Sequence, residues 1–210
     1  ELRQANTETS EIAVQSQMEK SDEKYEYAVD SGTNTATITK YLGNESVIAI
    51  PEKIENLVIV SIGDYAFQDC KGLTEVEIPG SVTNIGTEAF EGCESLSTIT
   101  LNDGLESVGR NFIGGTQVTE LTVPKTVTSM NYALYGAQNL KKVSFGEGME
   151  KIPGYVFQRW NSYDPSSKVE EIEIPEGVKT IGRSVFDNCD GWSEIKLPES
   201  LETIEDGAFM

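Results

Sequence analysis

Histidine is absent from the 210-residue chain, and no apolar run approaches the roughly 18 residues of a membrane-spanning helix. Without histidine, Ser-His-Asp and Cys-His nucleophile activation and the usual zinc ligation are excluded. We therefore expect a protein that is not an enzyme, that has no metal site and no cofactor, and that does not insert directly into a membrane.

Basic residues are scarce as well. The chain has 16 Lys and Arg against 35 Asp and Glu, a net charge of −19. A field of this sign repels phosphate backbones and anionic lipid, so we expect no nucleic-acid partner. A cationic protein patch, a neutral glycan or a calcium ion is compatible with it.

A strand-like segment with alternating apolar residues recurs along the chain. Its copy at Leu73–Pro79 places Val76 and Ile78 on one side and Glu75 and Glu77 on the other. The central apolar residue recurs at Ile48, Val76, Ile99, Leu121, Val143, Ile172 and Ile195, in steps of 28, 23, 22, 22, 29 and 23. A constant unit with two insertions explains every step, and fixed periods of this length are typical of solenoids.

Two further columns of residues share this period. One consists of Phe67, Phe90, Phe112, Leu134, Phe157, Phe186 and Phe209, and the other of Ile62, Ile85, Val108, Met130, Ile152, Ile181 and Ile204. Proline often follows the strand and ends its hydrogen-bond ladder. Gly63, Gly86, Gly109 and Gly182 share a later corner, but Pro153 and Glu205 occupy it too, so a positive φ is not required there.

These columns predict stacked coils that bury each other's apolar edges. We expect a β-rich, right-handed superhelix with about seven rungs, parallel strands ~4.8 Å apart and short helical turns that bury the Phe residues. Neighbouring Phe rings should lie roughly 5 Å apart, within the favourable range for aromatic pairs.

The string Ile-Pro-x-x-Val-x-x-Ile-Gly-x-x-Ala-Phe-x-x-Cys-x-x-Leu is matched at every position from Ile78 to Leu96. It closely resembles the BspA-like (Treponema-type) leucine-rich repeat family, over about Val47 to Phe209. The resemblance implies a leucine-rich repeat solenoid on a secreted or cell-surface bacterial protein that takes part in adhesion. The family has no catalytic residues to carry over.

The ends differ from the repeats. Residues 1–24 are polar and predict a disordered leader or tether with a helical tail near Val14 to Lys20. Residues 25–46 predict a β-hairpin that caps the first rung. Residues 47–210 form the expected solenoid, which Phe209 and Met210 end in mid-repeat, as in a fragment.

Cys70, Cys93 and Cys189 occupy one repeat position, which Gly115 and Ala137 share in other units. An odd number of cysteines excludes a complete internal disulfide framework. We favour buried free thiols over a disulfide between Cys70 and Cys93. The segment Asp187–Gly191 lacks the spacing of a calcium loop and is interpreted as a polar turn.

The outward strand positions form a polar, largely acidic face without aromatic residues. Regular spacing on an open sheet favours a solvated acidic face over a catalytic carboxylate pair. As a recognition surface it suits a polar or basic protein. The candidate contacts on this face are Glu75, Glu77, Glu120, Glu171 and Glu173.

An insertion over Gln158–Lys168 carries Arg159, Trp160 and Tyr163. These residue types are enriched at binding hot spots, and insertions in solenoids often lie on the binding side. The alternative is a loop whose Trp packs on the solenoid flank.

We predict a secreted or cell-surface module that recognises a host or microbial surface protein. The alternatives are a glycan-binding module that uses the Trp160 and Tyr163 loop and a spacer within a larger secreted protein.

Overall fold

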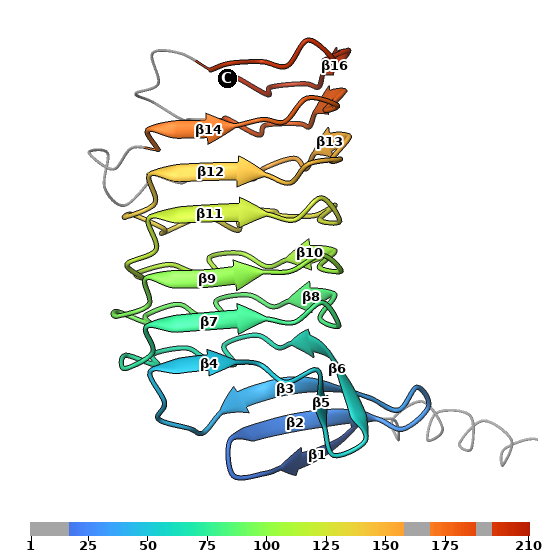
Figure 1. Ribbon diagram of the computed structural model, residues 1–210, viewed down its shortest axis with the longest axis vertical. Helices are drawn as coiled ribbons and strands as arrows, with labels where there is room; N and C mark the ends of the chain where they lie inside the picture. Colours follow the sequence, from blue (N-terminus) through green and yellow to red (C-terminus); the bar gives the residue numbers. More distant parts are fainter. Residues whose placement is uncertain (1–16, 158–168, 188–194) are drawn as a thin grey trace, which may run out of the picture.

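The computed structural model describes residues 17–157, 169–187 and 195–210, which form an elongated stack of coils (Figure 1). Strands are the regular elements of this stack, and the described residues contain no helix. Each complete coil contributes a strand to one side, a shorter extended stretch to a second side and a run of turns to the third. We name these sides the strand face, the short-strand face and the turn face.

The strand face consists of parallel strands in one column (Figure 1). They are β4 (Val47–Ala49), β7 (Glu75–Ile78), β9 (Thr98–Leu101), β11 (Glu120–Val123), β12 (Lys142–Phe145) and β14 (Glu171–Glu173). The central apolar residues pair in register within each sheet, for example Val76 with Ile99 and Leu121 with Val143, which confirms the predicted column. At the seventh position the described residues 195–198 form no strand, so seven complete rungs are not confirmed.

The short-strand face repeats the same arrangement. It contains β6 (Leu57–Ile62), β8 (Asn84–Ile85), β10 (Ser107–Val108), β13 (Lys151–Ile152), β15 (Thr180–Ile181) and β16 (Thr203–Ile204). Ile62 pairs with Ile85, Ile85 with Val108, and Ile152 with Ile181, so the second predicted column is formed. Val82 and Ile85 are fully buried, as the sequence predicts.

The expected helical turns are wrong. On the turn face some backbone N–H groups donate to the next coil: Phe67 N lies 2.8 Å from Ala89 O, and Glu88 N lies 2.8 Å from Arg110 O. Others donate to the carbonyl three residues back, as Gln68 N does to Tyr65 O at 3.0 Å, so the segments are turns and not a helix. At one repeat position of the turn face the residues have a left-handed φ between +48° and +63°, which interrupts a right-handed helix. This left-handed column consists of Tyr65, Glu88, Asn111, Tyr132, Tyr155 and Ser184.

The glycine corner works by close approach. Gly63, Gly86, Gly109 and Gly182 have no positive φ, which confirms the prediction that a positive φ is not required there. A Cβ atom on Gly109 would lie 2.5 Å from the backbone of Gly86 and Thr87 in the preceding coil. A Cβ atom on Gly86 would lie 2.5 Å from Asp64 N. Glycine therefore sets how closely two coils stack at this corner.

The Phe column is formed in part. The rings of Phe67 and Phe90 stack with centroids 4.8 Å apart, as predicted. In the next coil the column holds Ile113 and not Phe112, because Thr116 N donates to Ile113 O as Cys93 N donates to Phe90 O. Thr116, and not Gly115, therefore occupies the cysteine position of that coil.

Cys70 and Cys93 are free thiols. Cys93 is fully buried, and its Sγ lies 3.1 Å from the carbonyl oxygen of Phe67. A hydrogen bond with Cys70, together with burial, raises the pKa of the Cys93 thiol. Cys189 lies outside the described residues.

An antiparallel sheet covers the first coil. It consists of β1 (Gln17–Ser21), β2 (Tyr25–Asp30) and β3 (Thr35–Tyr41), and β3 also pairs in parallel with β6, which β5 (Lys53–Ile54) extends. The predicted hairpin is therefore present. Residues 17–21 are a strand and not a disordered leader or a helical tail, because their backbone pairs with β2.

Candidate functional site

The strand face presents two columns of outward side chains because residues along a strand alternate between its two sides. The first column runs through Glu75 and Thr98 in one sheet and Glu120, Lys142 and Glu171 in the other. The second contains Glu77 and Thr100, then Thr122, Ser144 and Glu173. All five predicted glutamates are exposed on this face, while the apolar residues between them point inward. Their role in binding stays a prediction.

Lys142 links two of these glutamates. Its Nζ lies 2.7 Å from Glu173 Oε1 and 3.3 Å from Glu171 Oε1, and Ser144 Oγ lies 2.7 Å from Glu173 Oε2. Hydrogen bonds from Lys142 and Ser144 lower the pKa of the Glu173 carboxyl. Glu75 and Glu120 form no ion pair with a described residue and are available for a cationic partner.

Beyond β14 the strand face opens into a groove of about 560 Å³ between β14 and residues 195–198. The same two coils remain bonded on the other faces, where Thr203 N lies 2.9 Å from Lys179 O and Phe186 N lies 2.8 Å from Ala208 O. Ile172 is consequently only half-buried, whereas Val143 in the preceding coil is fully buried.

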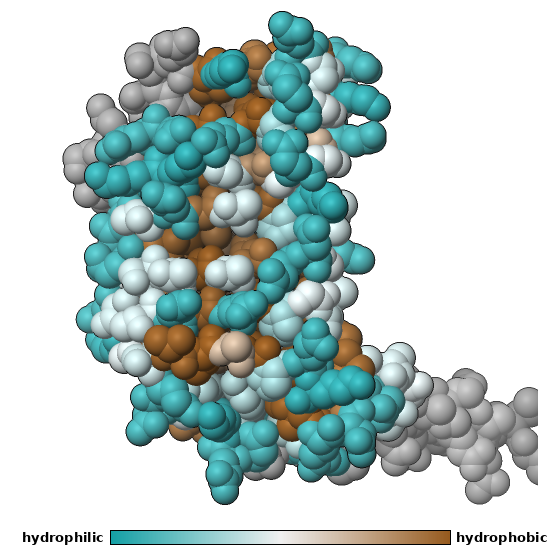
Figure 2. All heavy atoms as spheres, viewed as in Figure 1, coloured by the Kyte–Doolittle hydropathy of each residue, from teal (hydrophilic) through white to brown (hydrophobic). Residues whose placement is uncertain are grey.

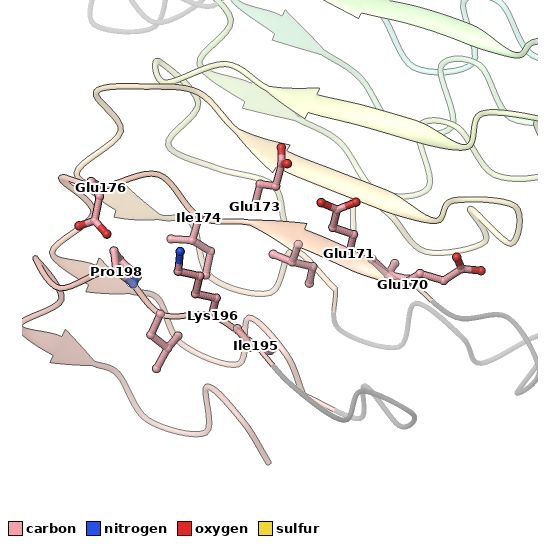
Figure 3. Close-up of a pocket in the computed structure, with 11 residues that line it drawn as sticks. Glu170, Glu171, Glu173, Ile174, Glu176, Ile195, Lys196 and Pro198 are labelled. Atoms are coloured by element: carbon pink, nitrogen blue, oxygen red, sulfur yellow. The ribbon is translucent and has the colours of Figure 1, made fainter.

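The groove combines an apolar lining with acidic groups (Figure 3). Ile172, Ile174, Ile195 and Leu197 contribute apolar surface, Glu170, Glu171, Glu173 and Glu176 contribute carboxylates, and Lys196 contributes one cation. Lys and Arg bury an apolar stem and keep a charged end in water, so this lining suits such side chains.

The insertion that the sequence favours as a binding loop lies outside the described residues. Arg159, Trp160 and Tyr163 lie outside the described residues, as does the segment after Asp187 that was compared with a calcium loop. Among the described residues, no three His, Cys, Asp or Glu side chains are grouped as metal ligands. No helix in the described part of the chain could cross a membrane.

The turn face carries residues that the sequence analysis did not single out. Tyr132 and Tyr155 stack with ring centroids 6.3 Å apart, and the Arg110 guanidinium lies 4.8 Å from the ring centroid of Tyr135. The sequence contains a weak pattern for these tyrosines, because Tyr65, Tyr132 and Tyr155 each lie two residues before a member of the predicted Phe column.

Viewed from the side shown in Figure 1, hydrophilic residues cover most of the molecule and leave a lengthwise band of hydrophobic residues visible between them (Figure 2). Most of the apolar residues are buried in one core that runs through all described coils. The faces therefore differ in their surface side chains and not in the core that they share.

The sequence model of the BspA-type leucine-rich repeat region, which comprises six repeat copies, matches residues 60–163 and 161–210. No curated protein sequence matches the chain.

Solved structures resemble the whole stack. A leucine-rich cell surface protein from Faecalibacterium prausnitzii A2-165 is 27% identical with a TM-score of 0.64, over 91% of this chain and 52% of that one. The Treponema pallidum leucine-rich repeat protein is 23% identical with a TM-score of 0.55, over 82% and 89%. The pneumococcal vaccine antigen PcpA is 18% identical with a TM-score of 0.53, over 89% and 42%. This chain spans about half the length of the Faecalibacterium structure.

Proposed function

The chain belongs to the BspA-type leucine-rich repeat family, and from that premise we propose that it is a non-enzymatic module that recognises a protein at a cell surface. The strand face is the recognition surface. One observation carries this proposal: the outward residues of six strands are held in register within two three-stranded sheets while the inward residues make the core. The outward side chains are thus free to differ without loss of the fold.

The partner that suits this face carries a basic patch. Glu75 and Glu120 are exposed and without a described ion-pair partner, and the groove beyond β14 adds carboxylates beside an apolar lining. The net charge of −19 attracts a cationic protein at long range and repels nucleic acid. A partner lysine or arginine would place its stem against Ile174 and its charge near Glu173 or Glu176.

The proposed localisation, at the cell surface or in the secreted fraction, is based on similarity to a solved structure. The Faecalibacterium structure, 27% identical over 91% of this chain, is of a leucine-rich cell surface protein. Absence of catalysis is supported by the sequence, which has no histidine for Ser-His-Asp or Cys-His activation of a nucleophile.

The test is binding of the fluorescently labelled chain to intact epithelial and bacterial cells. The double variant Glu75→Lys/Glu120→Lys reverses charge on the strand face and should reduce binding roughly tenfold or more. Its matched control is Glu106→Lys/Glu202→Lys, because both residues are exposed, lie at the short-strand face and change the net charge equally.

A second arm identifies the class of partner. Protease treatment of the cells before the assay should abolish binding. Retention of binding after proteolysis, or an equal loss in the two double variants, would contradict protein recognition by the strand face.

A further inference from the structure

Two arginines on the turn face form no ion pair with a described residue, although acidic residues outnumber basic ones by 35 to 16 in the sequence. All nine ion pairs among the described residues are made by lysines. Arg110 and Arg183 are both exposed and appear in none of them. The carboxylate next to Arg183, that of Glu205, is bonded to Lys151 and to the backbone N–H of Arg183. Within the described part of the chain, neither guanidinium group is therefore paired with a carboxylate.

A row of backbone hydrogen bonds connects the two arginines. Asn111 N lies 3.0 Å from Tyr132 O, Tyr132 N lies 3.2 Å from Tyr155 O, and Tyr155 N lies 2.9 Å from Arg183 O. Three coil steps of ~4.8 Å thus separate the Arg110 coil from the Arg183 coil, about 14 Å in all. The stacked rings of Tyr132 and Tyr155 lie between them.

The tyrosines stand where an aromatic residue is costly. Tyr132 and Tyr155 have φ of +55° and +63°, a region that glycine and asparagine enter more readily than an aromatic residue. Other coils have Tyr65, Glu88, Asn111, Ser184 and Gly207 at the equivalent place, so the left-handed backbone belongs to the repeat. Tyr132 and Tyr155 are distinguished by their stacked rings on neighbouring coils.

Arg110 is also held in place. Its guanidinium stacks over the Tyr135 ring, which fixes the plane of the fork and leaves its edge for a bidentate acceptor. Carboxylate is the acceptor that matches this fork. Next to it, Tyr132 is 36% exposed and offers an aromatic surface.

We propose that Arg110, Tyr132, Tyr155 and Arg183 form a binding site for an acidic sugar, an oligosaccharide whose terminal pyranose carries a carboxylate. An arginine binds the carboxylate, and the tyrosines pack against the apolar faces of the sugar rings and donate from their hydroxyls. The row of about 14 Å is long enough for more than one sugar ring. This site lies on a different face from the proposed protein-recognition surface and does not depend on it.

Charge selects a small anion over a large one. A nucleic acid or a Glu-rich peptide brings many negative charges into the field of a protein of net charge −19 and is repelled along its length. A sugar with one carboxylate meets that repulsion once, while the arginine that binds it acts within the roughly 8 Å over which charges are felt in physiological salt.

The experiment is calorimetric titration of the whole chain at physiological ionic strength. The probes are 3′-sialyllactose with lactose as its neutral analogue, and a glucuronic acid-terminated disaccharide with its glucose-terminated analogue. At least one acidic sugar should bind ten or more times tighter than its neutral analogue. The double variant Arg110→Gln/Arg183→Gln should lose roughly tenfold or more of that affinity. Arg110→Lys/Arg183→Lys, which keeps the charge but not the fork, should recover only part of it.

The controls separate binding from folding. Lys40→Gln/Lys53→Gln removes the same charge from exposed lysines elsewhere and should leave affinity unchanged. Tyr132→Asn/Tyr155→Asn keeps a residue that tolerates the backbone and should weaken binding several-fold with the fold intact. The proposal is overturned if neither acidic sugar exceeds its neutral analogue, if the arginine variants bind as the parent does, or if a Glu-rich decapeptide binds more tightly than both sugars.

Discussion

The strand face and the turn face are built by the same repeat but treat their outward side chains differently. On the strand face every outward residue has an extended backbone, and Lys142 is paired with Glu171 and Glu173. On the turn face one repeat position has a left-handed backbone, and Arg110 and Arg183 form no ion pair with a described residue. The strand face is thus an extended and mostly acidic surface. Between residues 110 and 183 the turn face instead combines left-handed residues, stacked tyrosine rings and two arginines without a described ion-pair partner.

This difference shows at which positions of the repeat the amino acid can vary. The core fixes the inward residues of both faces, so neither can change there without loss of packing. Outward residues cost little on a strand, and their identity therefore says little about use. On the turn face the left-handed position favours glycine or asparagine, so each other residue there is kept at some cost in stability.

The largest expected effect comes from the interior beneath the turn face. Phe90→Ala removes a fully buried ring that stacks on Phe67 and should reduce the free energy of unfolding by about 3–5 kcal/mol. Ile99→Val, beneath the strand face, should cost only about 0.5–1.5 kcal/mol. Urea unfolding followed by circular dichroism measures both. Equal losses would mean that the two interiors contribute alike.

A smaller effect is expected at the glycine corner between faces. Gly109→Ala places a Cβ atom 2.5 Å from the backbone of the preceding coil, so the two coils must separate. We expect a loss of roughly 1–3 kcal/mol in urea unfolding, as for overpacked cores. Gly72→Ala is the control, because a Cβ atom there meets nothing within 4 Å. A loss as large at Gly72 would point to chain flexibility and not to coil spacing.

A Glu→Gly substitution should change the stability in opposite directions on the two faces. Glu88→Gly removes a side chain from a left-handed residue and should stabilise the chain by up to about 1 kcal/mol. Glu120→Gly, within β11, should destabilise it by about 0.5–1 kcal/mol because glycine loses more freedom in a strand. Thermal unfolding of both variants gives the two signs. A loss in both would show that Glu88 is not strained.

The smallest effect is the pH dependence of the strand face. The pKa of Glu173 lies below its ordinary value of 4.5, so the stabilisation from Lys142 and Ser144 is complete above that pH. It is lost as pH falls through the lowered pKa of the folded state. Glu173→Gln should therefore reduce the fall in Tm between about pH 6 and pH 3 slightly. Identical pH profiles of Tm for the parent and Glu173→Gln would show that the ion pair does not contribute to stability.

The inward residues were predictable because packing repeats them. Val76, Ile99 and Leu121 recur for one reason, the burial of an apolar edge against the next coil, so the sequence predicts their register. The unit around Phe112 was misaligned for the same reason: Ile113 is apolar too, and the sequence alone does not say which of two adjacent apolar residues enters the column. The left-handed φ of Asn111 decides it.

The turn face could not be predicted because its backbone pairs between coils. An Ala-Phe segment favours a helical turn locally, but the N–H of Phe67 finds its acceptor 22 residues away in Ala89. The groove beyond β14 was also missed, since residues 195–198 repeat the strand pattern without a pairing partner in the structure. Of the predicted site, the five glutamates are exposed on one face, and the insertion at Arg159 stays a prediction.

The most direct test of two independent surfaces is a two-by-two binding measurement. Cell binding and 3′-sialyllactose affinity would be recorded for Glu75→Lys/Glu120→Lys and for Arg110→Gln/Arg183→Gln. The account predicts that the first variant loses cell binding and keeps the sugar, and that the second loses the sugar and keeps protease-sensitive cell binding. Loss of both activities in either variant, with the fold intact, would contradict it.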